Sequence, residues 1–308
     1  VNARRAVVET RGVCGYDGNT LASCYYSASN GGQTELASHV WGGADEKYLK
    51  MYDDPYDLEN PQSVLYTYTL PKTFSSPDAL GALKDAVLGA LSETMEARGY
   101  DGDTRSISVT GIESSATQTA MYVDSLSKLT TKLRLNVYVS GRRLISDDEE
   151  EAAFSIFSAT PAPAPQTEGA RYGDLRALSA PVAIDLDLFP TIEKACGLSI
   201  NAENNEIITV RETDSAFILE SRRFGHGVGM SQRGAQWMAL TYDWTYEQIL
   251  RFYYPGMTLK TVDLSYAMPS PLGASFLSTP GPAASPTHKP DLPVTLAPRD
   301  RVATVTNI

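Results

Sequence analysis

The sequence predicts a mixed α+β fold, with mainly antiparallel strands and a few helices around a cleft. Three observations predict it. A pattern with a central glycine turn over residues 12–26 is typical of a β-hairpin. Residues 76–99 carry the apolar stripe and the end signals of an amphipathic helix. Residues 129–141 alternate apolar and polar side chains, which is the period of a half-buried strand.

The first segment, residues 4–52, is predicted to consist of strands and turns. Its first residues are β-rich, and the hairpin that follows turns at an Asp-Gly-Asn sequence. A three-residue loop would place Cys14 opposite Cys24, so a disulfide is one interpretation of this pair. Two buried free thiols are a second interpretation. A zinc site with His39 is a third, which is short of four ligands.

Residues 62–145 are predicted to form an α+β unit. Residues 64–70 alternate as a strand, and the next helix is expected to start at a Ser76 cap and to end at Gly99. The helix is predicted to bury one stripe: Leu80, Leu83, Val87, Leu91 and Met95. The strand near residue 135 is predicted to turn one face inward: Leu133, Leu135, Val137 and Val139.

The later segments are predicted from shorter patterns. Residues 147–159 begin with five acidic residues, which suit a helix start or a solvated face, and a proline-containing loop follows. Residues 183–198 are predicted to be helical, and residues 206–220 to hold two strands. Helices are predicted to begin near Met230 and near Trp244.

The composition changes near residue 266. Residues 267–300 hold eight of the eighteen prolines and few apolar side chains, so residues 266–300 are predicted to be a linker. Residues 301–308 are β-prone and are interpreted as the start of another module. The main domain is therefore assigned to residues 1–265, and Val1 is expected to lie inside structured sequence, as in a fragment or a processed product.

Length and charge exclude some classes of protein. The 308 residues, 42% of them hydrophobic, suffice for a sizeable core. A net charge of −11 argues against nucleic acid as the main partner, because phosphate binding needs a basic face. No run of about 18 apolar residues is present, so no membrane span is predicted in this sequence.

The stretch FGHGVGMSQRGAQWMAL, residues 224–240, places alternating glycines between a predicted strand and a predicted helix. Its spacing differs from the dinucleotide fingerprint, the P-loop, the zinc-protease helix and the serine-hydrolase elbow. Such glycines let the backbone approach a ligand closely, and His226 could donate a hydrogen bond or transfer a proton. The simpler interpretation is a tight strand-to-helix turn with a buried histidine and a Ser231 cap.

Four stretches, in this order, resemble the stage II sporulation protein D / amidase-enhancer family of bacterial cell-wall proteins. They are AVVETRGVCGYDGNTLASCYYSASNGGQTE, YLKMYDDPYD, FGHGVGMSQRGAQWMAL and ILRFYYPGMTL. The resemblance covers residues 4–265. Residues 62–190 match weakly and are interpreted as an insert or subdomain. Residues 301–308 resemble the start of a bacterial Src-homology-3-like wall-binding repeat.

The resemblance implies peptidoglycan remodelling outside the cytoplasm, in association with the cell wall. Sporulation members of the family resemble lytic transglycosylases that cleave glycan strands stripped of their peptides, and other members enhance a cell-wall amidase. The family's acid is a glutamate in a segment that would lie upstream of Val1, and Glu9 is not its equivalent. We therefore expect no catalytic residue in this chain, no cofactor and no metal. We expect glycan strands as the partner, with other cell-wall hydrolases as further partners.

The resemblance also implies which residues bind substrate. From the first loop they are Ser27, Ser29, Gly31, Gly32 and Thr34, and from the second His226, Gly227, Ser231, Gln232 and Gly234. The two loops are expected to meet in space and to line one cleft. Arg233 stands where the family more often has an aromatic residue. The rival hypotheses are a non-catalytic wall-binding or amidase-enhancing module and, from the glycines alone, a nucleotide-binding loop.

Overall fold

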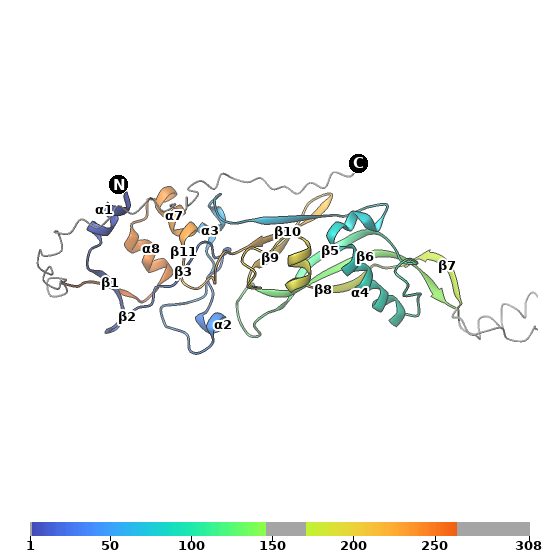
Figure 1. Ribbon diagram of the computed structural model, residues 1–308, viewed down its shortest axis with the longest axis horizontal. Coiled ribbons are helices and arrows are strands. Elements are labelled where there is room, and N and C mark those ends of the chain that lie inside the picture. Colours follow the sequence, from blue (N-terminus) through green and yellow to red (C-terminus); the bar gives the residue numbers. More distant parts are fainter. Residues whose placement is uncertain (1, 146–170, 264–308) are drawn as a thin grey trace, which may run out of the picture.

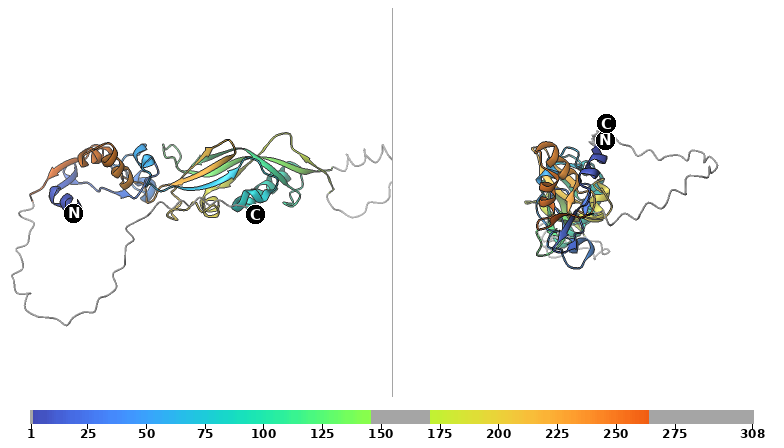
Figure 2. Two further views of the ribbon diagram at one scale, coloured as in Figure 1. Left: turned by 90° about the horizontal axis from the view of Figure 1, so that it is seen from above. Right: turned by 90° about the vertical axis from the view of Figure 1, so that its left-hand side faces the viewer.

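The computed structural model describes residues 2–145 and 171–263, which form two lobes along the long axis of the molecule (Figures 1 and 2). Both ends of the described chain build the first lobe, and the residues between them build the second. The chain leaves the first lobe after α3 (Pro55–Glu59) and returns after β10 (Ala216–Arg222). The helix, loop, linker and terminal strand predicted in residues 146–170 and 264–308 lie outside the described residues.

The first lobe packs helices beside short strands. Its core holds Leu49, Val228, Met238 and Tyr253, which come from distant parts of the sequence. Strand β1 lies between β12 and β2, and β11 pairs in parallel with β3. Its other elements are α1 (Asn2–Glu9), β1 (Val13–Asp17), β2 (Thr20–Leu21), β3 (Tyr26–Ser27), α2 (Ala37–Trp41), β11 (Met230–Ser231), α7 (Gln232–Thr241), α8 (Tyr246–Tyr253) and β12 (Thr258–Thr261).

The second lobe holds the larger core and two antiparallel sheets. Strand β10 lies between β4 and β9, and β6 pairs with β5 on one side and with β7 and β8 on the other. The elements besides β10 are β4 (Tyr66–Pro71), η1 (Pro77–Leu83), α4 (Lys84–Ala97), β5 (Ser108–Ala120), β6 (Thr130–Leu144), β7 (Tyr172–Ala177), β8 (Val182–Asp187), η2 (Leu188–Ile192), α6 (Glu193–Ala195) and β9 (Ile207–Glu212).

The mixed, mainly antiparallel α+β class is confirmed, and so are the two strongest patterns within it. Ser76 caps the predicted helix through a hydrogen bond from the Asp78 amide. The predicted helix forms two elements, η1 and α4, and η1 itself is kinked at Gly81, yet the whole predicted stripe is buried. The four predicted inward residues of β6 are also buried. Burial of these two faces against each other forms the core of the second lobe.

The prediction of a strand over residues 4–14 is wrong for its first half, which forms α1. Alanine and arginine favour a helix, and Arg5 and Glu9 form an i,i+4 ion pair of 3.5 Å on its surface. The prediction of a helix over residues 183–198 is also wrong at its start. Residues of β8 alternate strictly between buried and exposed as they pair with β6, so the two-residue period decides the structure there.

The hairpin is confirmed, but its loop has two residues, because Asp17 pairs with Thr20. Cys14 therefore lies opposite Lys260 of β12 and not opposite Cys24. All three cysteines are free thiols, and Cys24 is exposed, which contradicts the expectation that both thiols of the pair are buried. Within residues 2–145 and 171–263 no helix is both long and apolar enough to cross a membrane.

Candidate functional site

The two motif loops meet in space, as the sequence predicts. We call residues 27–35 the serine loop and residues 224–231 the histidine loop. Ser29 and Phe224 exchange two backbone hydrogen bonds, of 3.2 and 2.8 Å. The parallel pairing of β3 with β11 lies beside this bridge. The two loops are therefore joined by backbone hydrogen bonds, independently of their side chains.

A buried carboxylate of α3 holds both loops. Asp57 accepts hydrogen bonds from the hydroxyls of Ser29 and Ser231, at 2.8 and 2.6 Å, and from the amide of Gly31 at 3.0 Å. The Asp57 side chain is buried, so no water is available to replace the carboxylate as the acceptor for these three donors. Ser231 in turn caps α7 by accepting a hydrogen bond from the Gly234 amide at 3.0 Å. One carboxylate thus fixes both loops and the start of α7.

A second carboxylate, Asp54, lies beside the first. It accepts hydrogen bonds from the side chains of Asn30 and Tyr253, at 2.8 and 2.6 Å. Burial raises the pKa of Asp54, and the hydrogen bonds oppose that shift. Gly234 passes so close that a Cβ would contact the Tyr253 hydroxyl and would lie 2.8 Å from Asp54 Oδ2. Glycine at this position is therefore required by packing.

A buried ion pair supports the other side of the serine loop. Arg223 is completely buried, and its Nη1 lies 3.2 Å from Glu35 Oε2. Its remaining donors reach the carbonyl oxygens of Asn30 at 3.0 Å and of Gln33 at 3.1 Å. A single guanidinium therefore fixes the backbone of the loop at two points, with its charge balanced by Glu35.

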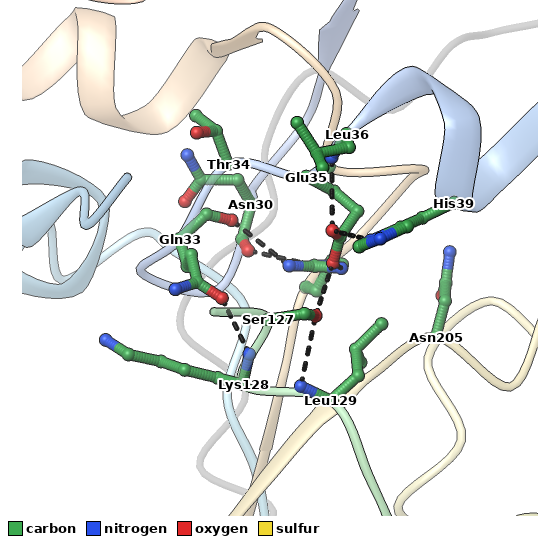
Figure 3. Close-up of polar contacts among 12 residues, drawn as sticks. Asn30, Gln33, Thr34, Glu35, Leu36, His39, Ser127, Lys128, Leu129 and Asn205 are labelled. Carbon is green, nitrogen blue, oxygen red and sulfur yellow. Dashed lines mark hydrogen bonds and ion pairs between the residues drawn. The ribbon is translucent and has the colours of Figure 1, made fainter. Parts of the chain in front are cut away.

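The Glu35 carboxylate is also the centre of the polar contacts drawn in Figure 3. It accepts hydrogen bonds from His39 Nδ1 at 2.7 Å, Ser127 Oγ at 2.8 Å and the Leu36 amide at 3.1 Å. Burial alone would raise the pKa of Glu35, but the charge of Arg223 and these hydrogen bonds hold that pKa below its ordinary value. Glu35 is therefore ionised at neutral pH and is unsuited to donate a proton.

The connection between β5 and β6, residues 121–129, reaches from the second lobe to the serine loop. Gln33 donates to the Leu126 carbonyl at 3.0 Å and accepts from the Lys128 amide at 2.7 Å. Lys128 Nζ also lies 2.7 Å from Asp53 Oδ1. This contact, part of which is visible in Figure 3, ties the second lobe to the candidate site.

His226 stands where the two loops join, and its ring is held from one side. Its Nδ1 accepts a hydrogen bond from the Val228 amide at 3.0 Å, so the neutral ring carries its proton on Nε2. Burial lowers the pKa of His226, and the nearby charge of Arg223 lowers it further. The Gly227 amide is occupied by Ser27 Oγ at 2.8 Å. The imidazole is therefore a neutral, oriented group at neutral pH.

Two exposed aromatic side chains adjoin His226. The ring centroids of Trp41 and His226 are 4.9 Å apart, and Tyr25 meets His226 edge-on at 6.3 Å. Tyr25 and Trp41 also contact each other, with centroids 4.8 Å apart, and remain 41% and 51% exposed. We call these three residues the aromatic platform. Neither Tyr25 nor Trp41 is among the residues that the resemblance implies for substrate binding, although Tyr25 lies within the first matching stretch and Trp41 lies between the first and the second.

The ten residues that the resemblance implies for substrate binding separate into two groups. His226 is half-buried and Gln232 is exposed, so their direct contact with a ligand stays a prediction. The other eight are buried: Ser27, Ser29, Gly31, Gly32, Thr34, Gly227, Ser231 and Gly234. Their hydroxyls already have protein partners; that of Thr34, for example, donates to the Lys50 carbonyl at 2.8 Å. These eight support the site from below and do not line its surface.

The candidate site presents three partly exposed side chains, those of Tyr25, Trp41 and His226. One cavity of about 330 Å³ is lined by residues that include Tyr48 and Pro255, and one of about 310 Å³ borders α8; none of the ten implied residues lines either of them. Over the described residues, no group of three or more His, Cys, Asp or Glu side chains is arranged to hold a metal ion. What these residues offer is two partly exposed aromatic side chains beside a half-buried imidazole.

Comparison with known proteins gives one informative match. No protein-family model matches the chain. The chain is 27% identical over 259 residues to a protein of Bacillus subtilis (strain 168) named amidase enhancer, and the match covers 84% of this chain. It covers 32% of the relative, so the chain spans about a third of that protein's length. The match supports placing the chain in an amidase-enhancer-like family.

Proposed function

We propose that this chain binds the glycan strands of bacterial peptidoglycan on the aromatic platform, as part of an extracytoplasmic protein that remodels the cell wall. The observation that carries the proposal is the pair of exposed rings, Tyr25 and Trp41, in contact with His226. The C–H groups of a pyranose ring form an apolar face that packs on aromatic rings, while its hydroxyls need hydrogen-bond partners at the edge. The platform supplies both.

His226 serves the proposal as an oriented donor. A neutral imidazole with its proton on Nε2 can donate to a sugar hydroxyl or to an acetamido carbonyl oxygen without burying a charge. The buried network beneath it, from Asp57 to Arg223, fixes both loops before a ligand arrives. A preorganised site loses less conformational entropy on binding, which favours affinity for a flexible polymer.

For the chain itself we propose a binding role that promotes the action of a cell-wall amidase, the partner suggested by the name of the relative. Glycan held on the platform would bring that enzyme close to the amide bonds that it hydrolyses, which join the peptides to the glycan strands. The carboxyls nearest the loops support this choice over catalysis by the described residues. Glu35 is held ionised, Asp57 is buried and already accepts from both loops, and Asp54, whose pKa is raised, is fully buried beneath α7 and α8.

Binding to purified glycan strands stripped of peptides tests the proposal. Trp41→Ala and Tyr25→Ala are each expected to weaken binding about tenfold or more, since a well-packed aromatic contact contributes about 1.5 kcal/mol beyond its area. Tyr246→Ala, which removes an equally exposed tyrosine on α8, is the matched control. Binding that is unchanged in both platform variants, or equally weakened in the control, would reject the platform as the site.

Lytic transglycosylase cleavage of stripped glycan strands is the second candidate, favoured by the match of residues 224–240 to the family motif. It requires a carboxylic acid with a raised pKa to protonate the glycosidic oxygen. We propose that any such acid comes from a longer protein and not from the described residues. The chain incubated with stripped strands is then expected to leave them intact. Strands that acquire anhydro-sugar ends in this assay would show that the acid lies within the chain.

A further inference from the structure

Two glutamates are buried side by side behind the histidine loop. Glu193 of α6 is 3% exposed and Glu206, just before β9, is 1% exposed. The carboxyl of Glu193 lies within hydrogen-bonding reach of Glu206 and of Ser199. Among the described residues, its Oε1 has no hydrogen-bond partner. Two buried carboxylates in contact cannot both remain ionised without a cation, because their repulsion adds to the cost of burial.

Glu206 is equipped to be the ionised member. It accepts backbone hydrogen bonds from Ile200 at 2.9 Å, Asn201 at 3.0 Å and Asn205 at 3.1 Å. Three amide donors stabilise a carboxylate strongly. No backbone amide is bonded to the Glu193 carboxyl among the described residues, and the neighbouring charge of Glu206 disfavours its ionised form. The proton therefore belongs on Glu193. The Oε1 of that residue is then a neutral carbonyl oxygen, which tolerates burial without a partner far better than a charged oxygen does.

The segment that Glu206 organises, residues 199–206, holds the histidine loop. Asn205 Nδ2 donates to the Gly225 carbonyl at 3.2 Å, and Asn201 Oδ1 accepts from the Gly225 amide at 3.4 Å. The two asparagines are joined to each other at 2.6 Å. Both backbone groups of the residue before His226 are thus held by a loop that depends on the glutamate pair.

We propose that Glu193 and Glu206 share one proton, and that this pair positions Gly225 and hence His226. The pair consists of positioning residues, since neither side chain reaches the platform. The assignment of His226 to ligand binding rests on the proposed function, whereas the shared proton and the holding of Gly225 do not. The proton is expected to leave as the pH rises, which places two negative charges in the core and loosens the loop.

Glu193→Gln tests the shared proton, because glutamine keeps the shape and supplies a permanent neutral donor to Glu206. Glu203→Gln, an exposed change in the same loop, is the matched control. Burial and Glu206 raise the pKa of Glu193 from its ordinary value of 4.5, so its favourable contribution is complete below pH 4.5 and is lost as the pH rises through the folded-state pKa. Over that window the folding equilibrium of the wild type should fall, relative to E193Q, by up to about tenfold per pH unit.

Three readouts decide the matter. Urea unfolding from pH 5 to 8 should show E193Q gaining on the wild type, while E203Q runs parallel to it. Exchange of the Gly225 amide with solvent should accelerate with pH in the wild type beyond the intrinsic rate, and less so in E193Q. Glu206→Gln should be more damaging at pH 7 than E193Q, because an amide nitrogen cannot accept the Asn205 N–H.

Parallel pH profiles for the wild type and E193Q would overturn the proposal, as would E193Q being as damaging as E206Q. Stabilisation of the wild type, but not of E193Q, by calcium chloride would indicate that a bound cation and not a proton lies between the two carboxylates. That result would also overturn the proposal. Glycan binding measured across the same pH range separates the two proposals. If no glycan binds at any pH, the platform hypothesis fails, while the unfolding and exchange results still judge the glutamate pair.

Discussion

Removal of the Asp57 carboxylate is expected to destabilise the first lobe more than any ordinary surface change. Asp57→Ala leaves the Ser29 and Ser231 hydroxyls and the Gly31 amide without their acceptor, in a site that water does not reach. Each buried donor left unsatisfied costs about 1–3 kcal/mol, so the sum over the three donors is roughly 3–9 kcal/mol. Typical domains are stable by about 5–15 kcal/mol, so this change is a large part of the total.

Urea unfolding followed by tryptophan fluorescence measures this effect in the right part of the molecule. The three tryptophans, Trp41, Trp237 and Trp244, all lie in the first lobe, so the signal reports on that lobe and not on the second. Asp53→Ala is the control. It removes a neighbouring carboxylate whose exposed ion pair with Lys128 should contribute less than about 1 kcal/mol. A cost for D57A within 1 kcal/mol of that for D53A would refute the role assigned to Asp57.

A double-mutant cycle separates the hydrogen bond of Asp57 from the rest of its surroundings. Ser231→Ala removes one donor and should by itself cost about 1–3 kcal/mol, partly through loss of the α7 cap. In the double variant with D57A the cost should be clearly less than the sum, since the same 2.6 Å contact is lost in both single variants. Strict additivity would mean that the two groups do not interact.

Three further outcomes follow from the same coordinates. Gly234→Ala should destabilise the protein by about 1–3 kcal/mol through overpacking. Gly89→Ala, in an open and exposed part of α4, should instead stabilise it by about 0.5–1 kcal/mol. Urea unfolding of both variants measures the two effects. In an NMR titration, the pKa of His226 should lie below its ordinary value of 6.5. Its favourable contribution to stability is then present above pH 6.5 and is lost as the pH falls toward the folded-state pKa. A titration midpoint above 6.5 would contradict the argument that burial lowers this pKa. Iodoacetamide at pH 8 should label exposed Cys24 before Cys196, whose pKa burial raises to about 12, and mass spectrometry of the native protein reads the order.

The fold could be predicted from the sequence where one period extends over a long segment. Strand β6 and helix α4 each bury the stripe that the pattern indicates, because a long pattern leaves one face for the core. Shorter segments were decided by partners that the pattern does not contain. The valines of α1 remain exposed, and none of the described strands pairs with that segment, whereas β8 is a strand because β6 offers it an unpaired edge. Local sequence is ambiguous at this length, and tertiary pairing resolves it.

The residues of the candidate site also could be predicted only in part from the sequence. The two loops meet as the sequence resemblance predicts, but the resemblance cannot distinguish a serine that contacts a ligand from one that donates to a buried carboxylate. Asp57 lies 26 residues after Gly31, and nothing in their spacing predicts the bond between them. The distinction requires burial, which depends on the whole fold.

Burial also explains why so many motif residues face inward. Sharp turns with glycine at positive φ, such as Gly227 at 79°, expose backbone donors that must be satisfied from within. Side chains of the motif supply those partners: Ser27 accepts from Gly227 and Ser231 from Gly234. On the proposed function, a substitution in the aromatic platform would reduce ligand binding through lost contacts. A substitution among the buried motif residues beneath it would reduce binding through lost loop geometry. The two layers are distinguished by their effect on unfolding, which the buried layer controls and the platform does not.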